Sequence, residues 1–79
     1  MKAAIKIYTT GYCPFCDAAK ALLEARGLDF EEIDVSDPRK KMELMEKTGW
    51  RTVPQIFIKD QLIGGYQELA QLDAKGDLV

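Results

Sequence analysis

The chain has 79 residues, 11 basic and 13 acidic side chains and a net charge of -2, and 47% of its residues are hydrophobic. This length predicts one domain over residues 1–79, near the size at which a single core is only marginally stabilising. The charge balance excludes a strongly basic nucleic-acid surface, and no apolar run approaches the roughly 18 residues of a membrane span. The N-terminal residues lack the apolar core of a secretory signal and there is only one close cysteine pair, so we expect a cytoplasmic protein.

The first predicted element is a strand over residues 2–8, where Ile5 and Ile7 indicate a position inside a sheet. A helix should follow it to about residue 26, with Gly27 as its left-handed stop. The buried face of this helix is marked by apolar residues at helical spacing, namely Ala18, Ala19, Leu22 and Leu23.

The only two cysteines, Cys13 and Cys16, stand at the turn between this strand and this helix. If Cys13 is the N-cap and Pro14 the first helical residue, the free amides of the first turn and the helix dipole favour a thiolate on Cys13. A thiolate is the nucleophilic form of cysteine, and a sulfur of low pKa is also expelled easily from a mixed disulfide. We therefore interpret the pair as a redox centre.

Two other interpretations of the cysteine pair remain open. A structural disulfide would close a loop so short that chain entropy gives it only about 2 kcal/mol. A zinc half-site would need two more ligands from a second chain, because this chain has no His and no further Cys.

A second strand is predicted over residues 28–35, where Phe30, Ile33 and Val35 are the candidates for burial. Acidic residues between them indicate an exposed edge of the sheet. Because a helix joins this strand to the first one, the two should pair in parallel through a right-handed crossover.

A second helix should begin at Asp37 and Pro38 and end before Gly49. Met42 and Met45, which flank Leu44, are predicted to form its apolar face. Its first turn carries three cations whose charge opposes the helix dipole, so they form either a solvated face or an anion site: Arg39, Lys40 and Lys41.

The last third of the chain predicts a hairpin and a helix. Residues 55–58 read as a strand that begins after Pro54, residues 59–61 as a tight turn and residues 62–63 as the returning strand. A helix over residues 66–75 follows two glycines. The order β-α-β-α-β-β-α predicts an α/β fold with a four-stranded mixed sheet and helices on its faces.

Four segments together resemble the dithiol glutaredoxins, in particular the small bacterial glutaredoxin 3 type. They are Cys-Pro-Phe-Cys after the first strand, Thr-Val-Pro-Gln-Ile-Phe-Ile, Gly-Gly-Tyr-Gln-Glu-Leu and Leu-Asp-Ala-Lys-Gly. The resemblance covers nearly the whole chain. It implies a thioredoxin-like fold, a cis peptide bond before Pro54, and reduction of protein disulfides and glutathione mixed disulfides with electrons from glutathione.

The resemblance also implies roles for individual residues. Cys13 matches the attacking cysteine and Cys16 the resolving one. Lys41 matches the position that holds the glycine carboxylate of glutathione, and Thr52 and Val53 match the segment whose backbone pairs with the tripeptide. The other residues implied at the glutathione site are Phe15, Pro54, Gly65, Tyr66 and Gln67.

Three positions depart from the pattern of the family. Thr10 replaces a frequent lysine, Phe15 replaces the commoner tyrosine, and Gln67 with Glu68 stands where two aspartates are frequent. The changes at Thr10 and Gln67 remove charge, so we expect glutathione binding to be weaker or differently tuned, while the reaction class stays the same.

The implied electron donor is glutathione, with no metal. The implied partners are disulfide-containing or glutathionylated proteins, with ribonucleotide reductase as one candidate, and neither nucleic acid nor membrane is expected. We expect a monomer. Three alternatives remain open: a redoxin that depends on thioredoxin reductase, an iron-sulfur carrier in which Cys13 and glutathione from two chains hold a cluster, and an interaction module with an inert thiol pair.

Overall fold

Seven elements follow one another in the predicted order in a computed structural model, which describes residues 4–78. They are β1 (Ile5–Thr9), α1 (Pro14–Ala25), β2 (Glu31–Asp34), α2 (Pro38–Thr48), β3 (Gln55–Ile58), β4 (Gln61–Gly64) and α3 (Tyr66–Ala74). Residues 2 and 3, which the sequence assigns to the first strand, lie outside the described residues. Among the helices of residues 4–78, none combines the length and apolar content needed to span a bilayer.

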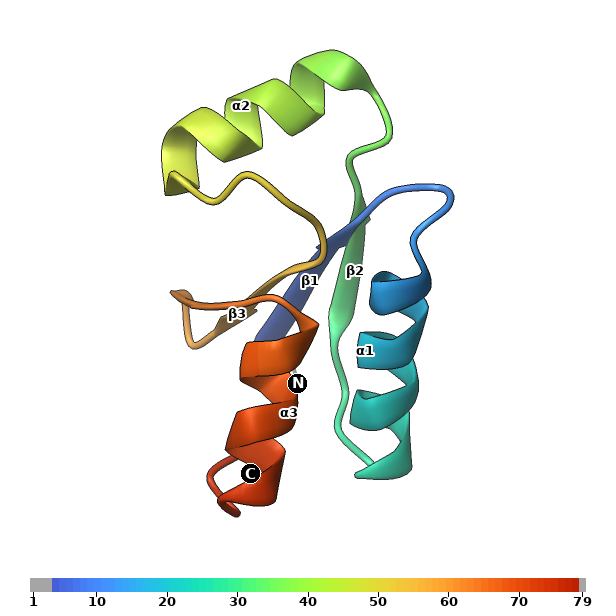
Figure 1. The fold of residues 1–79 in the computed structure, drawn as a ribbon, viewed down its shortest axis with the longest axis vertical. Coiled ribbons are helices and arrows are strands. Elements are labelled where there is room, and N and C mark those ends of the chain that lie inside the picture. Colours follow the sequence, from blue (N-terminus) through green and yellow to red (C-terminus); the bar gives the residue numbers. More distant parts are fainter. Residues whose placement is uncertain (1–3, 79) are drawn as a thin grey trace.

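The four strands form one mixed sheet in the order β2-β1-β3-β4. β1 pairs in parallel with β2 and antiparallel with β3, and β3 pairs antiparallel with β4 (Figure 1). The acidic strand β2 lies at the edge of the sheet and the apolar strand β1 lies inside it, as the sequence predicted. Their order and helical crossover confirm the thioredoxin-like arrangement.

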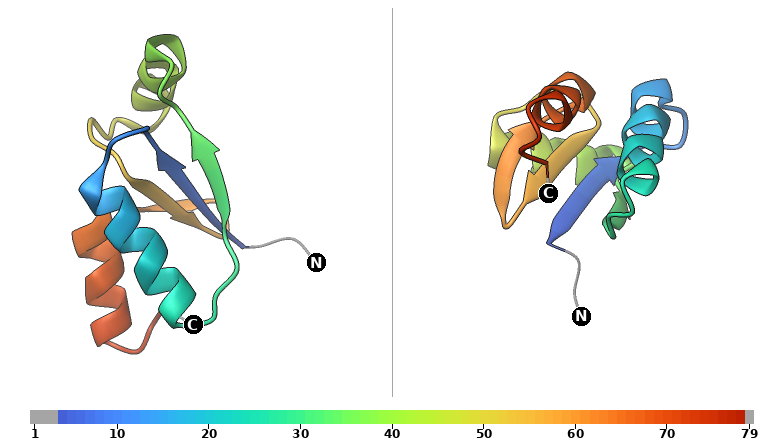
Figure 2. Two further views of the ribbon diagram at one scale, coloured as in Figure 1. Left: turned by 90° about the vertical axis from the view of Figure 1, so that its right-hand side faces the viewer. Right: turned by 90° about the horizontal axis from the view of Figure 1, so that it is seen from below.

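One face of the sheet is covered by α1 and α3, which run side by side (Figure 2). The core lies between these helices and the sheet, and it brings together seven buried residues: Ile5, Ile7, Ala19, Leu23, Ile56, Leu69 and Leu78. Burial of these apolar side chains is the main stabilising contribution to the fold. Since α1 begins at the cysteine pair, this packing fixes the position of Cys13 relative to the sheet.

The position of α2 differs from the expectation of helices on the faces of the sheet. α2 lies beyond the end of the sheet, above the start of α1 in Figure 1. Asp37 caps it through the Arg39 amide at 2.9 Å, and Gly49 ends it in the left-handed conformation with φ of 74°, both as predicted.

The predicted apolar face of α2 is wrong in one respect. Within α2, all of whose residues are described, only Leu44 is buried, whereas Met45 is half-buried and the side chain of Met42 is 63% exposed. A helix at the end of a sheet has a smaller packing surface than a helix on its face. The apolar spacing in the sequence therefore overstates how much of α2 is buried.

Candidate active site

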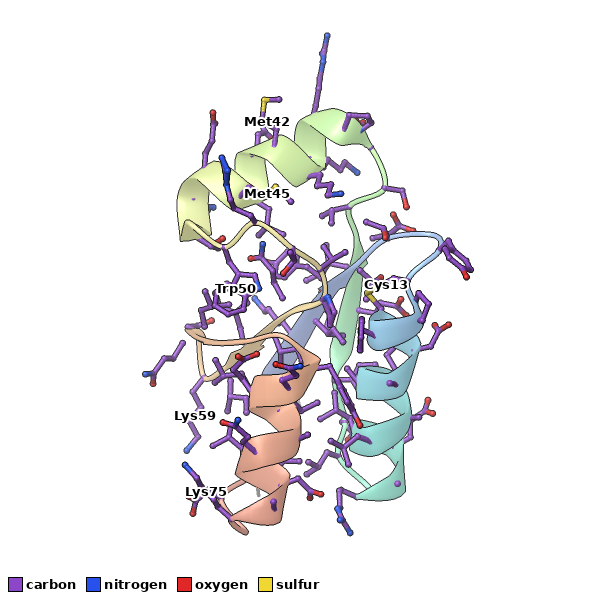
Figure 3. All side chains as sticks on the ribbon, in the orientation of Figure 1. Cys13, Met42, Met45, Trp50, Lys59 and Lys75 are labelled. Atoms are coloured by element: carbon purple, nitrogen blue, oxygen red, sulfur yellow. A yellow bond between two sulfur atoms is a disulfide. The ribbon has the colours of Figure 1, made fainter. Side chains whose placement is uncertain are left out.

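The cysteine pair lies at the N-terminus of α1, where Cys13 and Cys16 form a disulfide with their Cα atoms 5.1 Å apart (Figure 3). Cys13 is the N-cap and Pro14 opens the helix, as the sequence predicted. The Cys16 amide donates a hydrogen bond to Cys13 Sγ at 3.1 Å. In the dithiol form the same amide, together with the positive end of the helix dipole, can stabilise a thiolate on Cys13.

The two sulfurs differ in accessibility. Cys16 is 1% exposed and Cys13 is 9% exposed, and the side chains next to Cys13 in the chain are open to solvent, with Tyr12 90% exposed and Phe15 60% exposed. An incoming disulfide therefore reaches Cys13 first. Cys16 lies one turn further into the helix, where it contacts Cys13 from inside the protein.

A second segment, distant in the sequence, lies against the cysteine pair. The Val53 carbonyl is 3.9 Å from Cys13 Sγ, although the two residues are 40 positions apart. The Val53-Pro54 peptide bond is cis, in agreement with the resemblance described above. The start of β3 and the start of α1 therefore form the two sides of one site.

A hollow of about 340 Å³ opens beside this contact. It is lined by residues from three separate segments, namely Phe15, Trp50, Thr52, Val53, Pro54, Gly65, Tyr66, Gln67 and Glu68. The rings of Phe15 and Tyr66 approach with their centroids 6.3 Å apart. Every protein residue that the resemblance implied at the glutathione site lines this hollow, except Lys41. Lys41 lines a neighbouring groove on α2.

Comparison with known proteins identifies this arrangement. The glutaredoxin family model matches residues 5–63, which include both cysteines and the Val53-Pro54 segment. The chain belongs to the glutaredoxin family. It is therefore a thiol-disulfide oxidoreductase.

Curated relatives cover this glutaredoxin nearly end to end. Glutaredoxin 3 of Escherichia coli is 46% identical over 77 residues, which cover 96% of this chain and 93% of that protein. A glutaredoxin of Pseudomonas aeruginosa is 44% identical over 75 residues, which cover 94% of this chain and 89% of the relative.

Solved structures of glutaredoxins share the fold. The solution structure of the Brucella melitensis glutaredoxin is 43% identical with a TM-score of 0.83, and the match covers 96% of this chain and 84% of that one. The crystal structure of a buckwheat glutaredoxin-glutathione complex is 26% identical with a TM-score of 0.86, covering 96% of this chain and 73% of that one.

In this glutaredoxin, the start of α3 is shaped by Gly64 and Glu68. Glu68 Oε1 accepts a hydrogen bond from the Gly65 amide at 2.9 Å. Gly64 has φ of 122°, and a Cβ atom there would lie 2.7 Å from Glu68 Cγ, so only glycine fits. The following amides, of Tyr66 and Gln67, have no partner inside the helix because they belong to its first turn. Both residues line the hollow, where amides at a helix N-terminus can donate to an anionic group.

Sequence reasoning missed Trp50 and Glu68 as lining residues. Trp50 is the only tryptophan of the chain and precedes Thr52 by two positions, which was the available signal. Its Nε1 is buried and has no hydrogen-bond partner among residues 4–78. Glu68 was noted only as a departure from a frequent aspartate.

Hydrogen bonds hold the backbone of Trp50 in place. The fully buried Gln55 donates from Nε2 to the Trp50 carbonyl at 2.8 Å and accepts at Oε1 from the Thr48 hydroxyl at 2.9 Å. The Trp50 amide donates to Thr48 Oγ1 at 3.1 Å. These bonds join the end of α2 to the start of β3 and thereby fix the loop that carries Val53 to Cys13.

A polar cluster connects β1, β2 and α1 near the base of the site. Glu32 accepts hydrogen bonds from the Thr9 hydroxyl at 2.8 Å and from Lys20 Nζ at 3.0 Å. The Thr9 hydroxyl, and next Lys20, hold the pKa of the Glu32 carboxyl below its ordinary value of 4.5. The hydrogen bond to Glu32 in turn raises the pKa of Lys20. The ammonium group of Lys20 is therefore paired with the Glu32 carboxylate, and we assign it no contact with the sulfurs.

The acidic and sulfur-containing side chains do not form a metal centre in the described part of the chain. Within residues 4–78, no group of three or more His, Cys, Asp or Glu side chains is arranged to hold a metal ion.

Proposed function

We propose that this glutaredoxin reduces protein disulfides and glutathione mixed disulfides with electrons from glutathione, with Cys13 as the nucleophile and Cys16 as the resolving cysteine. The observation that carries the proposal is the position of Cys13 Sγ. It caps α1 and lies 3.9 Å from the carbonyl of Val53, which lines a hollow of about 340 Å³. The buckwheat relative with the same fold was crystallised with glutathione, which supports the tripeptide as the ligand.

In the reaction with a protein disulfide, the Cys13 thiolate attacks one sulfur and releases the other as a thiolate of the client. The Cys16 thiol then loses its proton and attacks Cys13 Sγ, which releases the second client thiolate and leaves the Cys13-Cys16 disulfide. Two molecules of glutathione reduce this disulfide and leave as oxidised glutathione, so two electrons pass from glutathione to the client. Glutathione mixed disulfides need only Cys13, because a second glutathione can resolve its adduct.

Glutathione is proposed to bind across the hollow. The backbone of Thr52 and Val53 would pair with the tripeptide as an added strand does, and the start of α3 would receive the γ-glutamyl carboxylate through the Tyr66 and Gln67 amides. Lys41, on the adjoining groove, would attract the glycine carboxylate. Phe15, Pro54 and Gly65 would provide the apolar and close-fitting walls.

The cellular setting is proposed on the same grounds. The clients would be proteins with an accessible disulfide or a glutathionylated cysteine, ribonucleotide reductase among them, and the compartment would be the cytoplasm. The protein would act as a monomer, with residues 1–79 as one domain and glutathione as its electron donor.

Turnover of a small glutathione mixed disulfide, coupled through glutathione reductase to NADPH oxidation, tests this proposal. We expect turnover in this system and much slower turnover when thioredoxin reductase replaces glutathione and its reductase. Activity only with thioredoxin reductase would contradict glutathione as the donor. Absence of turnover in both systems would favour an inert thiol pair.

A further inference from the structure

A second hollow, of about 740 Å³, lies on α2 next to the glutathione hollow. Its walls are mostly apolar and come from α2 and the loop that follows it, namely Pro38, Met42, Met45 and Gly49 with the stems of Lys41, Glu46 and Arg51. We call it the α2 groove. Figure 3 shows both methionines on α2, with Met42 at its upper side and Met45 nearer to Trp50. Methionine side chains are flexible and polarisable, so they adapt to apolar groups of different shape.

The α2 groove continues the glutathione hollow along the chain. Arg51 lines the groove, and Val53, two residues later, lines the hollow and lies 3.9 Å from Cys13 Sγ. Two residues span at most about 7 Å, so the groove begins within a few residues of extended chain from the reacting sulfur. Glutathione is a tripeptide that is proposed to occupy the hollow and to reach no further than Lys41 at the border of the groove, whereas the polypeptide of a protein client extends beyond it.

The groove is basic on an otherwise slightly acidic protein. The whole chain has a net charge of -2, yet Lys41 of α2 and Arg51 of the following loop line the groove, and Arg39 and Lys40 precede Lys41 on α2. Glu46 is the one carboxylate among the lining residues. An apolar floor with cations at its border is complementary to an apolar side chain next to a carboxylate.

From this continuity and this charge, we propose that the α2 groove docks the polypeptide of protein clients, and that it selects an apolar side chain flanked by acidic residues a few positions from the reacting cysteine. This inference rests on the proposed function, because the client cysteine must be at Cys13 for its neighbours to reach the groove. It concerns the choice of client and leaves the glutathione step as described.

Two glutathionylated peptides test the docking. They differ only at roughly two to four positions from their cysteine, where one carries Leu with Glu and the other carries Ser with Lys. The wild type should deglutathionylate the apolar acidic peptide with about tenfold higher kcat/KM. Met42→Glu should abolish this preference, and Arg51→Glu should reverse it toward the basic peptide. Because glutathione is itself anionic, the preference is measured as the ratio of kcat/KM on the two peptides, which a loss common to all glutathione substrates leaves unchanged. Lys75→Glu makes the same charge change beyond the end of α3, far from the groove in Figure 3, and should keep the preference.

The outcomes separate this inference from the proposed function. Equal kcat/KM for the two peptides in the wild type, or a preference that survives in both groove variants, would overturn the docking and leave the glutathione activity intact. Equal losses on the peptides and on the small substrate would also overturn it, since the residues would then act on the glutathione step. No turnover of any of the three substrates by the wild type would contradict the proposed function, and the docking with it.

Discussion

Cys13 and Cys16 share one disulfide but occupy different environments. Cys13 caps α1 and its sulfur lies 3.9 Å from the carbonyl of Val53, which lines the hollow, whereas Cys16 is almost fully buried inside the first turn. The Cys16 amide points at Cys13 Sγ, so the backbone supports negative charge on only one of the two sulfurs. This asymmetry supports the proposed division of labour, in which Cys13 attacks and Cys16 resolves.

Serine substitutions separate the two roles. Cys13→Ser should abolish exchange with every disulfide, because no other exposed thiol exists in the chain. Cys16→Ser should keep activity on glutathione mixed disulfides and lose at least about tenfold in kcat/KM on protein disulfides. Without Cys16, the mixed disulfide between Cys13 and the client is resolved only when an external thiol attacks it. Steady-state assays with both substrate classes measure this. A Cys13→Ser variant that remains active, or a Cys16→Ser variant that is inactive on both substrates, would contradict the assignment of Cys13 as the nucleophile and Cys16 as the resolving cysteine.

Gly64 offers a test of the geometry at the start of α3. Gly64→Ala should lower the free energy of unfolding by about 2 to 4 kcal/mol, because its φ of 122° disfavours a side chain and the new Cβ would meet Glu68 Cγ at 2.7 Å. Gly27→Ala is the matched control, since Gly27 also has a positive φ, 70°, but nothing lies within 4 Å of its added Cβ. It should cost about 1 kcal/mol. Urea unfolding of both variants measures the difference, and equal losses would show that the Glu68 contact is unimportant.

At the scale of elements, the site depends on connections between segments that each bury little surface. β2 is an edge strand with exposed acidic residues, and α2 buries only Leu44. Polar contacts supplement this limited packing: Thr9, Glu32 and Lys20 join β1, β2 and α1, and Thr48 with Gln55 joins α2 to β3. The first set lies at the end of β1, which leads to Cys13, and the second set lies at the start of β3, which follows Val53.

The cluster around Glu32 predicts a pH dependence of stability. Since the pKa of Glu32 is lowered in the folded protein, its carboxylate stabilises the fold above the ordinary value of 4.5, and this contribution is lost as the pH falls through the lower pKa of the folded state. Glu32→Gln should therefore lower the free energy of unfolding by about 1 kcal/mol at pH 7, a modest value because Glu32 is partly exposed, and by almost nothing once the pH is below the pKa of Glu32 in the folded state. Urea unfolding across this range measures the difference. Glu24→Gln, which removes the same charge from an exposed position of α1, is the control, and an equal pH-dependent loss there would contradict the role of the cluster.

At the scale of the whole molecule, charge is unevenly distributed. The net charge is -2, but the first turn of α2 has three consecutive cations, and Lys41 among them borders the proposed ligand surface. Anionic ligands such as glutathione are thus attracted to one end of an acidic protein.

Charge reversal at Lys41 tests this distribution. Lys41→Glu should raise the KM for glutathione about 5- to 30-fold at low ionic strength, corresponding to about 1 to 2 kcal/mol, with kcat nearly unchanged. The effect should diminish in about 0.5 M salt, where exposed charges are screened. Lys59→Glu, at the turn between β3 and β4, is the control for a general change in net charge. An unchanged KM in Lys41→Glu would assign Lys41 to the solvated face of α2.

The sequence predicted the order of elements and the sheet because local signals there agree with the final packing. Ile5 and Ile7 mark an interior strand, and Asp37, Pro38 and Gly49 mark the ends of α2. Met42 was assigned to a buried face because periodicity identifies the apolar side of a helix and does not say what packs against it. The approach of Val53 to Cys13 was foreseen only through the family resemblance, since no local rule joins residues 40 positions apart. Trp50 was missed because its place at the hollow depends on the path of the loop after α2.

The single indole of this chain gives the protein an intrinsic optical reporter. Trp50 is held by the Thr48 and Gln55 bonds and lines the glutathione hollow, so all tryptophan emission arises from one place beside the disulfide-bearing site. A ligand in the hollow should change the polarity around that ring, and unfolding should expose the ring to water. Fluorescence of the unlabelled protein therefore follows occupancy of the site and integrity of the loop in the same sample, without a coupling enzyme or an added dye.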